Sequence, residues 1–230
     1  MLYNVVVNEW GETTYVPTTL GNTLLAVLLV VFLVCAVAFA KKATSKADNA
    51  GSSRKLSAKQ LAFCSLSIAL GTVFSFIKLF DFPTGGSITL LSMLVICLPG
   101  YFFGTGAGLM SGIAYGILQL LIEPYIVHPA QLIIDYMLAF AALGLSGVFS
   151  NAKHGLVKGY VLGVIGRYIF AVLSGYIFFG AYAWDGWNPL PYSLVYNAIY
   201  IFSEAAATVV ILLIPPVKKA MTQIKTMANQ

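Results

Sequence analysis

The chain has 230 residues, of which 59% are hydrophobic and only 9% are charged. A water-soluble domain carries roughly 25% charged residues to keep its surface wetted. The composition therefore excludes an ordinary soluble domain and indicates a protein whose surroundings are mostly lipid. The formal net charge of +5 would suit nucleic acid only if the basic residues formed one groove, and their positions along the chain indicate no nucleic-acid partner.

Seven apolar segments predict an all-α membrane protein, because a spanning helix needs about 20 largely apolar residues and satisfies its own backbone hydrogen bonds. In chain order the predicted spans are Leu20–Ala40, Leu61–Phe80, Ile88–Phe103, Gly106–Ile122, Ala130–Phe149, Gly159–Ala181 and Tyr192–Ile214.

The first span differs from the others because a long polar segment separates it from the next span. This segment, Lys41–Lys59, is rich in Ser, Ala and Lys and is typical of a flexible tether. Ala38-Phe39-Ala40 resembles a signal-peptide cleavage site, but the apolar stretch is too long and acidic residues precede it, so an uncleaved anchor is predicted. The expected organisation is an extracellular N-terminus with an appended helix (1–42), a cytoplasmic basic linker (43–60), a six-helix membrane domain (61–217) and a cytoplasmic tail (218–230).

Lysine and arginine predict the orientation, because they resist translocation. They gather in the linker, after the fifth span and in the tail, as Lys41, Lys42, Lys46, Arg54, Lys55, Lys59, Lys153, Lys158, Lys218, Lys219 and Lys225. These segments share one side of the membrane, so the N-terminus is expected outside and the C-terminus in the cytoplasm. The acids expected at the outer face are Glu9, Glu12, Asp81, Glu123 and Asp185.

Three charged residues lie more than one helical turn from either end of a predicted span, where charge is costly and usually functional. Arg167 and Glu204 lie at matching depths from the cytoplasmic ends of their helices, which predicts a structural ion pair. Asp135 lies near the outer face and has no basic partner at its depth. It is either a ligand-binding carboxylate or a solvated acid at a helix end.

No catalytic or metal-binding pattern is present, so no enzymatic activity, cofactor or metal is expected. His128 and His154 are not spaced for metal binding with any acid. Cys35, Cys64 and Cys97 sit in apolar runs and are expected to be small buried hydrophobes. Gly85-Gly86-Ser87 either opens a helix that presents N–H groups to an anion or, as is commoner, makes a turn.

Aromatic and amide residues cluster at the outer ends of the last two spans and in the loop that joins them: Tyr176, Phe178, Phe179, Tyr182, Trp184, Trp187, Asn188, Tyr192, Tyr196 and Asn197. An interfacial aromatic belt accounts for Trp184 and Trp187. It does not account for Asn197, whose amide lies within the membrane and must find a partner. Aromatic faces beside a carboxylate are typical of a receptacle for a cationic heteroaromatic ring.

These residues carry a family resemblance over Leu61–Lys219. The motif Tyr182-Ala183-Trp184-x-Gly186-Trp187, followed by Tyr192-Ser193-Leu194 and Asn197, and the pair Asp135-Tyr136, ten residues after Tyr125, resemble the thiamine-specific S components of energy-coupling factor (ECF) vitamin transporters. The resemblance implies a six-helix substrate-binding domain that captures a vitamin outside. It also implies a transmembrane coupling protein and two ATPase subunits as partners, since the chain itself has no nucleotide-binding motif.

The resemblance also implies a binding site. Tyr192 and Asn197 match ligand-contacting positions, Tyr125 and Tyr136 match pocket aromatics, and Asp135 stands where the family has a glutamate. Phe179 replaces a family tryptophan and Ala171 a family histidine, while the first outer loop has Gly85-Gly86-Ser87 near the place of another tryptophan. With Trp184 added as a neighbouring aromatic, the implied ligand is thiamine, a related precursor or a pyrimidine.

Small residues recur along the second span as Ala58, Ala62, Ser65 and Ala69, a spacing that lets another helix approach closely. The resemblance implies that they dock against the coupling protein. A membrane scaffold or assembly protein without a small-molecule ligand is the alternative function, in which the polar residues only pin helices together. Titration with thiamine distinguishes the two.

Overall fold

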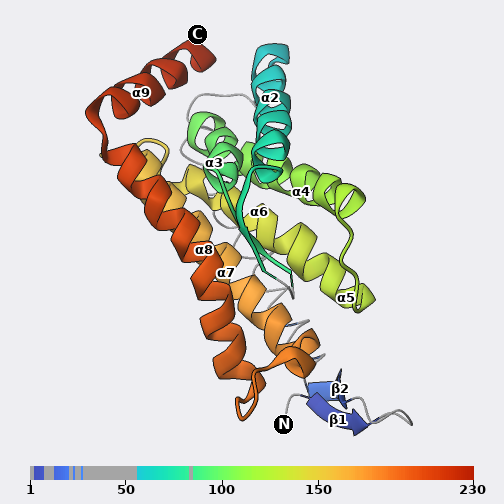
Figure 1. Cartoon of the computed structure of the whole chain (residues 1–230). Coiled ribbons are helices and arrows are strands. Elements are labelled where there is room, and N and C mark those ends of the chain that lie inside the picture. The colour runs from blue at the N-terminus through green and yellow to red at the C-terminus, as the bar shows by residue number, and fades with distance from the viewer. Residues whose placement is uncertain (1–2, 8–12, 21–22, 24–26, 28–55, 83–84) are drawn as a thin grey trace.

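The computed structural model describes residues 3–7, 13–20, 23, 27, 56–82 and 85–230. Most of the predicted first span, Leu20–Ala40, and most of the basic linker fall outside these residues. The rest forms a helical bundle (Figure 1), which confirms the predicted all-α membrane fold. Five helical segments of the described chain are long and apolar enough to cross a membrane: Ala58–Ser75 (α2), Thr105–Ile122 (α4), Pro129–Phe149, Gly155–Phe178 (α7) and Pro189–Leu213 (α8).

The predicted span Leu61–Phe80 is wrong at its C-terminal end. Helix α2 stops at Ser75, and the chain continues as strand β3 (Lys78–Asp81), which pairs antiparallel with β4 (Ser87–Thr89). Gly85 and Gly86 lie between the strands with φ of +91° and +85°, a region that only glycine adopts without strain. The turn expected for Gly85-Gly86-Ser87 is therefore confirmed, and the chain does not begin a helix there.

The predicted span Ile88–Phe103 is shorter than expected, because its first residues belong to β4 and the adjoining turn. Helix α3 (Ser92–Phe103) has 12 residues, which at 1.5 Å per residue gives about 18 Å. That is less than the ~30 Å hydrocarbon thickness of a typical bilayer. The β3–β4 hairpin thus precedes α3 where the sequence predicted more helix.

The segment Pro129–Phe149 is continuous but not uniform. It runs as α5 (Pro129–Leu132), a π-helical stretch η2 (Ile133–Leu138), α6 (Ala139–Leu143) and a 3₁₀-helical end η3 (Gly144–Phe149). The predicted span Ala130–Phe149 is confirmed in extent. The π-helical stretch widens the helix where it meets the candidate site described below.

Helix α4 packs on this segment through glycines at every fourth position. A Cβ atom on Gly108 would come within 2.7 Å of the Gly144 carbonyl oxygen, and one on Gly112 would collide with the Phe140 carbonyl oxygen. Gly116 lies in the same way against the Tyr136 carbonyl. Such small-residue spacing lets membrane helices approach backbone to backbone.

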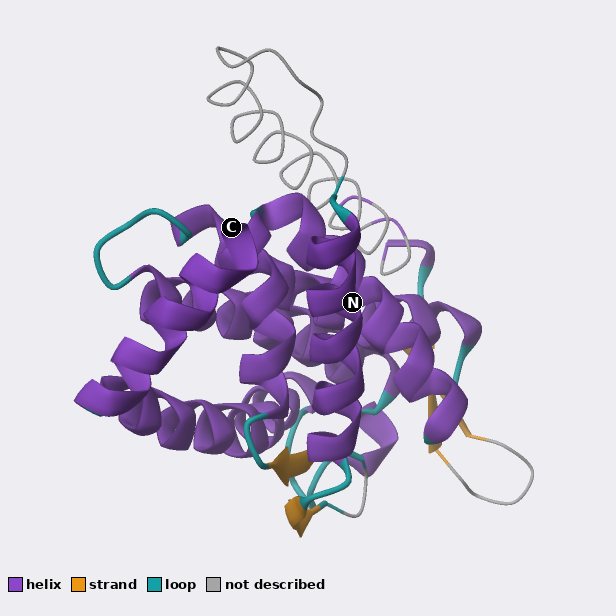
Figure 2. Cartoon of the chain, turned by 90° about the horizontal axis from the view of Figure 1, so that it is seen from above, coloured by secondary structure: helices purple, strands orange, loops and turns teal. Residues whose placement is uncertain are grey.

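Helix α7 covers the opposite side of Pro129–Phe149 in the same manner. Gly159 abuts the Ser146 carbonyl, and a Cβ atom on Gly163 would lie 2.9 Å from the Leu143 carbonyl oxygen. The Pro129–Phe149 segment is thus clamped between two glycine-bearing helices. Figure 2, the view from above, shows the strands at the margin of this helical body.

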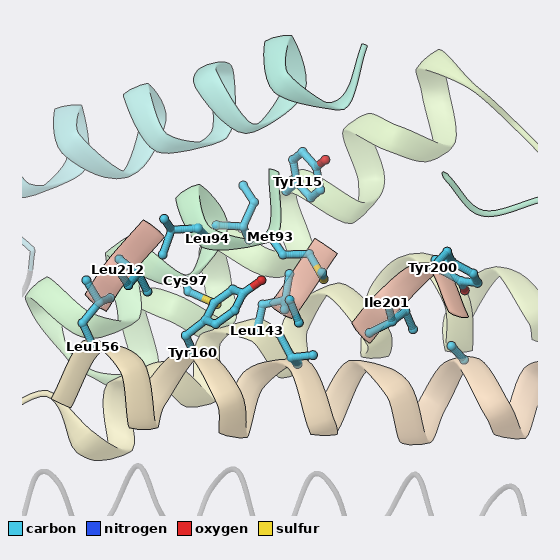
Figure 3. Close-up of a cluster of buried hydrophobic side chains, with 14 residues drawn as sticks. Met93, Leu94, Cys97, Tyr115, Leu143, Leu156, Tyr160, Tyr200, Ile201 and Leu212 are labelled. Carbon is cyan, nitrogen blue, oxygen red and sulfur yellow. The ribbon is translucent and has the colours of Figure 1, made fainter. Parts of the chain in front are cut away.

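The main core lies where α3, α7 and α8 meet. Figure 3 shows Tyr160 of α7 beside Cys97 of α3, with Leu143 next to them and Ile201 further along the core, and all four side chains are buried. Cys64 and Cys97 are free, buried thiols, as expected of small hydrophobes, whereas Cys35 lies outside the described residues.

The C-terminal segment, expected to be a tail from residue 218, forms helix α9 (Pro215–Asn229). It lies across the ends of the bundle helices: Lys59 Nζ donates to the Met227 carbonyl (2.7 Å) and Asn229 Nδ2 to the Phe102 carbonyl (3.2 Å). Lys225 Nζ sits 4.1 Å from the Tyr101 ring centroid, and burial lowers the pKa of Lys225. A short hairpin, β1 (Tyr3–Val7) with β2 (Thr13–Pro17), lies at the opposite end of the molecule (Figure 1).

Candidate ligand-binding site

A cavity of about 460 Å³ lies at the end of the bundle remote from α9, between η2, α7, α8 and the β3–β4 hairpin. Its volume falls within the range of roughly 300–1,000 Å³ that small-molecule sites occupy. Six of the seven residues predicted for substrate binding line it: Tyr125, Asp135, Tyr136, Phe179, Tyr192 and Asn197. The lining also includes Ala171, the position at which the family resemblance implied a histidine.

Asp135 is carried on the π-helical stretch η2 and has two donors on one of its oxygens. Gln131 Nε2 and Ser174 Oγ both donate to Asp135 Oδ2, each at 2.8 Å. Its other oxygen, Oδ1, accepts no hydrogen bond from the described residues. Because π-helical turns often mark functional positions, the geometry favours a carboxylate held in place for a ligand.

Asn197 finds its partners on its own helix. Its Nδ2 donates to the Ser193 carbonyl (2.8 Å), and its Oδ1 accepts from the Tyr200 hydroxyl (2.7 Å). The buried amide therefore has the partners that its depth demanded. These contacts orient Asn197 and Tyr200 together along the cavity wall.

Two tyrosines join the loop after α4 to the cavity. The Tyr136 hydroxyl accepts from the Tyr125 N–H (3.0 Å) and donates to the Glu123 carbonyl (3.1 Å). The Tyr125 ring stacks on Phe179, with centroids 5.8 Å apart and planes 15° apart. Interaction with the Tyr182 hydroxyl, together with burial, raises the pKa of Tyr125 to about 12, so this phenol is neutral at physiological pH.

Trp184 is the predicted site residue that does not line the cavity. Its ring instead meets Tyr192 edge-on with centroids 5.3 Å apart, and it contacts Trp187 at 5.1 Å in a similar way. Trp184 therefore supports a lining residue from behind.

The predicted ion pair between Arg167 and Glu204 is wrong. Within residues 56–82 and 85–230 no ion pair joins them, and the two side chains have different neighbours. Arg167 lines the cavity, with its guanidinium carbon 4.6 Å from the Phe140 ring centroid. Glu204 binds the end of β4 at Thr89 and the start of α3 at Ser92 and Met93. The two residues lie at similar depths along their helices, but their side chains do not face each other.

The β3–β4 hairpin covers part of the cavity, which the sequence did not predict. Phe82 packs against Tyr196 with ring centroids 5.5 Å apart, and the Tyr196 hydroxyl donates to the Gly85 carbonyl at 2.8 Å. At the rim, Lys78 Nζ lies 3.1 Å from Glu123 Oε1 and 3.3 Å from Asp81 Oδ2. All of these residues line the cavity.

Some cavity residues were missed although the sequence carried a signal for them. Gln131 lies four residues before the predicted Asp135 and therefore shares its helix face. Tyr196 and Tyr200 follow the predicted Tyr192 at the same interval along α8. Ser174 had no such signal, because its contact with Asp135 spans two helices. No group of three or more His, Cys, Asp or Glu residues that could hold a metal ion occurs in the described part of the chain.

These features define a multi-pass helical membrane protein with a polar, aromatic-lined cavity at one end, which is the architecture of an S component. The profile of the thiamine transporter protein family (Thia_YuaJ) matches residues 61–224. The chain therefore belongs to this family, and the predicted resemblance is confirmed.

Individual relatives agree with this assignment. Thiamine transporter ThiT of Bacillus subtilis (strain 168) is 36% identical over 133 residues, covering 52% of this chain and 69% of the relative. ThiT of Lacticaseibacillus paracasei is 30% identical over 118 residues, covering 44% and 59%. The solved structure of ThiT from Listeria monocytogenes superposes with a TM-score of 0.58 at 28% identity, covering 68% of this chain and 94% of that one.

Proposed function

We propose that the chain is the substrate-binding membrane subunit of an ECF-type vitamin uptake transporter, and that it binds thiamine or a related precursor. The observation that carries the proposal is Asp135, whose Oδ1 has no protein partner among the described residues although Gln131 and Ser174 fix its other oxygen beside the cavity. A scaffold protein would have no need of such a carboxylate in an aromatic-lined cavity of ligand size.

The chemistry of the cavity suits thiamine, which joins an aminopyrimidine to a cationic thiazolium ring. A carboxylate accepts strong hydrogen bonds from N–H groups and attracts a cation, while aromatic faces stabilise a cationic ring. Tyr125, Phe179 and Tyr192 supply such faces around Asp135. The Ala171 side chain offers no hydrogen bond and the Asn197 amide is bonded to Ser193 and Tyr200, so this chain relies on Asp135 for polar contacts more than the resemblance alone would imply.

The charge distribution supports capture from outside. Asp81 and Glu123 lie at the cavity end, whereas Lys218 and Lys225 belong to α9 at the remote end. Because basic residues stay on the cytoplasmic side, we infer that the cavity opens outward, with the N-terminus outside and the C-terminus in the cytoplasm.

Transport would then depend on partners. The predicted docking residues Ala58, Ala62, Ser65 and Ala69 are all exposed on α2. A strip of small, exposed side chains allows a helix of a transmembrane coupling protein to approach closely. Two partner ATPase subunits would supply the energy.

Titration of the purified protein with thiamine, monitored by tryptophan fluorescence, tests the binding proposal. Trp184 contacts Tyr192 of the cavity wall, so a saturable fluorescence change is expected. A Trp184→Phe variant that binds by calorimetry but has lost most of this change would assign the signal. If neither thiamine nor its pyrimidine precursor produces saturable binding in fluorescence or calorimetry, the scaffold alternative replaces the transport function.

A further inference from the structure

Glu204 lies on α8 below the cavity and is buried, with 3% of its surface exposed. Its Oε2 accepts from the Thr89 backbone N–H (3.2 Å) and the Thr89 hydroxyl (2.6 Å). Its Oε1 accepts from the Met93 N–H (3.0 Å) and the Ser92 hydroxyl (3.3 Å). Every one of these contacts is donated to the carboxylate, so a single side chain of α8 holds the junction between β4 and α3.

This junction has no cap of its own. The N-cap position of α3 is Leu91, which has φ of +61° and no side chain able to accept from the first turn. The first N–H groups of a helix need acceptors from elsewhere, and a negative charge is favoured at that end. Glu204 supplies both from a neighbouring helix. The left-handed turn at Leu91 therefore depends on a residue more than 100 positions away in the chain.

The same helix also holds the tip of the hairpin. Tyr196 donates to the Gly85 carbonyl (2.8 Å), and the Tyr200 ring lies so close to Gly86 that a Cβ atom there would be 2.8 Å from it. Tyr200 and Glu204 are four residues apart, one turn of α8, and Tyr200 is bound to Asn197. Helix α8 thus holds the hairpin at its tip beside the cavity and at its base through Glu204.

We propose that Glu204 is a positioning residue that retains the ligand without touching it, by anchoring the base of the β3–β4 hairpin over the cavity. The proposal rests on the proposed function, since it takes the cavity to be the ligand site. Without the anchor, the base of the hairpin and the first turn of α3 loosen together. The contacts of Phe82, Gly85 and Gly86 at the cavity then become intermittent, and bound ligand escapes faster.

The anchor can be tested first without any ligand, by hydrogen exchange of residues 78–93 in purified protein. Glu204→Gln replaces one acceptor oxygen by an NH₂ group that faces a donor, so amide exchange in this segment is expected to rise about tenfold, as for a lost hydrogen bond to a charged group. Thr208→Val is the matched control, because Thr208 is buried on the same face of α8 one turn further on. It is expected to leave the exchange of residues 78–93 within about twofold of the parent.

The effect on retention is measured as the rate of thiamine dissociation, monitored by tryptophan fluorescence after a chase. Glu204→Gln is expected to raise this rate several-fold and Thr208→Val to leave it unchanged. If Glu204→Gln does not fold, Thr89→Val removes one donor and keeps the carboxylate, and a smaller rise of both readouts is expected.

Unchanged exchange in the carboxylate and threonine variants, or an equal rise in the control, would overturn the anchor. Faster exchange with an unchanged dissociation rate would overturn its role in retention. If the parent chain binds no thiamine, the proposed function fails and retention fails with it, while the exchange result still decides whether Glu204 holds the hairpin.

Discussion

The two sides of the cavity are held in different ways. On one side, α4 and the Pro129–Phe149 segment touch backbone to backbone, as at Gly112 and the Phe140 carbonyl. On the other, α8 meets the hairpin through side chains, as in the bonds from Tyr196 to Gly85 and from Thr89 to Glu204. A backbone contact fixes one helix separation, whereas side-chain contacts can open and close. We therefore expect the glycine-packed side to be a rigid wall and the α8 side to be the part that responds to a ligand.

The largest loss of stability is expected from a substitution on the glycine-packed side. In Gly112→Ala the new methyl group would meet the Phe140 carbonyl oxygen and, at 2.9 Å, the Ala141 Cα. Backbone atoms cannot rotate away, so the helices must separate at a cost of about 3 kcal/mol. A fall of several degrees in the melting temperature of the detergent-purified protein would be the measured sign.

Gly106→Ala is the control for this substitution. It lies on the same helix, and a Cβ atom there would meet nothing within 4 Å. Alanine is favoured over glycine in a helix by up to about 1 kcal/mol, so this variant is expected to be as stable as the parent or slightly more stable. If both variants melt alike, the glycine contacts do not hold this wall.

The second-largest effect is expected on thiamine affinity, when Asp135 of the rigid wall is replaced. Asp135→Asn keeps a side-chain oxygen for Gln131 and Ser174 but removes the charge that faces the cavity. Loss of a hydrogen bond to a charged group costs about 2 kcal/mol, which weakens thiamine binding roughly 30-fold. Calorimetry with thiamine measures this loss, and Glu123→Gln, which removes an acid at the rim, is the control. The control is expected to change affinity less than about twofold, so it separates a specific contact with Asp135 from long-range attraction between acids and a cation.

The rigid wall and the responsive side were not equally predictable from the sequence. Asp135 on the rigid wall and Asn197 on α8 could be singled out because a polar group within a membrane needs a partner or a function. Tyr192, and the grouping of all three in one site, followed from the family resemblance. The hairpin was missed because Leu79 and Phe80 continue the apolar run of α2 although their side chains are exposed. Hydropathy measures how apolar a segment is, not whether its backbone bonds are made within a helix or across a turn.

The failed pairing of Arg167 with Glu204 has a related cause. Position along a helix gives depth, but the direction of a side chain around the axis depends on which neighbours pack against it. Glu204 points to the start of α3 and Arg167 to Phe140. The glycine spacing of α4 was present in the sequence at Gly108, Gly112 and Gly116. Such a spacing indicates which face of a helix can touch a neighbour.

A smaller loss of thiamine affinity is expected when the contact between α8 and the hairpin tip is weakened. Tyr196→Phe removes the hydroxyl that donates to the Gly85 carbonyl and keeps the ring that packs on Phe82. One neutral hydrogen bond contributes about 1 kcal/mol, so thiamine is expected to bind about fivefold more weakly, mainly through faster dissociation. An effect as large as that of Asp135→Asn would show that Tyr196 contacts the ligand itself.

The smallest effect is expected at the rim, where Lys78 links the hairpin to the end of α4 through Glu123. Burial opposes the charge of Lys78, but hydrogen bonds with Glu123 and Asp81 outweigh it and raise the pKa of this lysine. Because the ion pair is largely exposed, Lys78→Met should lower stability by less than about 1 kcal/mol, and by less still at high salt.

The raised pKa of Lys78 predicts how its contribution to stability changes with pH. A lysine whose pKa is higher in the folded state contributes stability that is fully present below the unfolded pKa of about 10.4 and is lost as pH rises through the folded value. The melting-temperature difference between the parent and Lys78→Met should therefore stay constant from neutral pH to about 9 and shrink only above about 10.5. Lys153→Met, which replaces an exposed lysine in the turn between η3 and α7, should melt at the same temperature as the parent at every pH. A constant difference at every pH would mean that Lys78 contributes by packing its carbon chain and not through its charge.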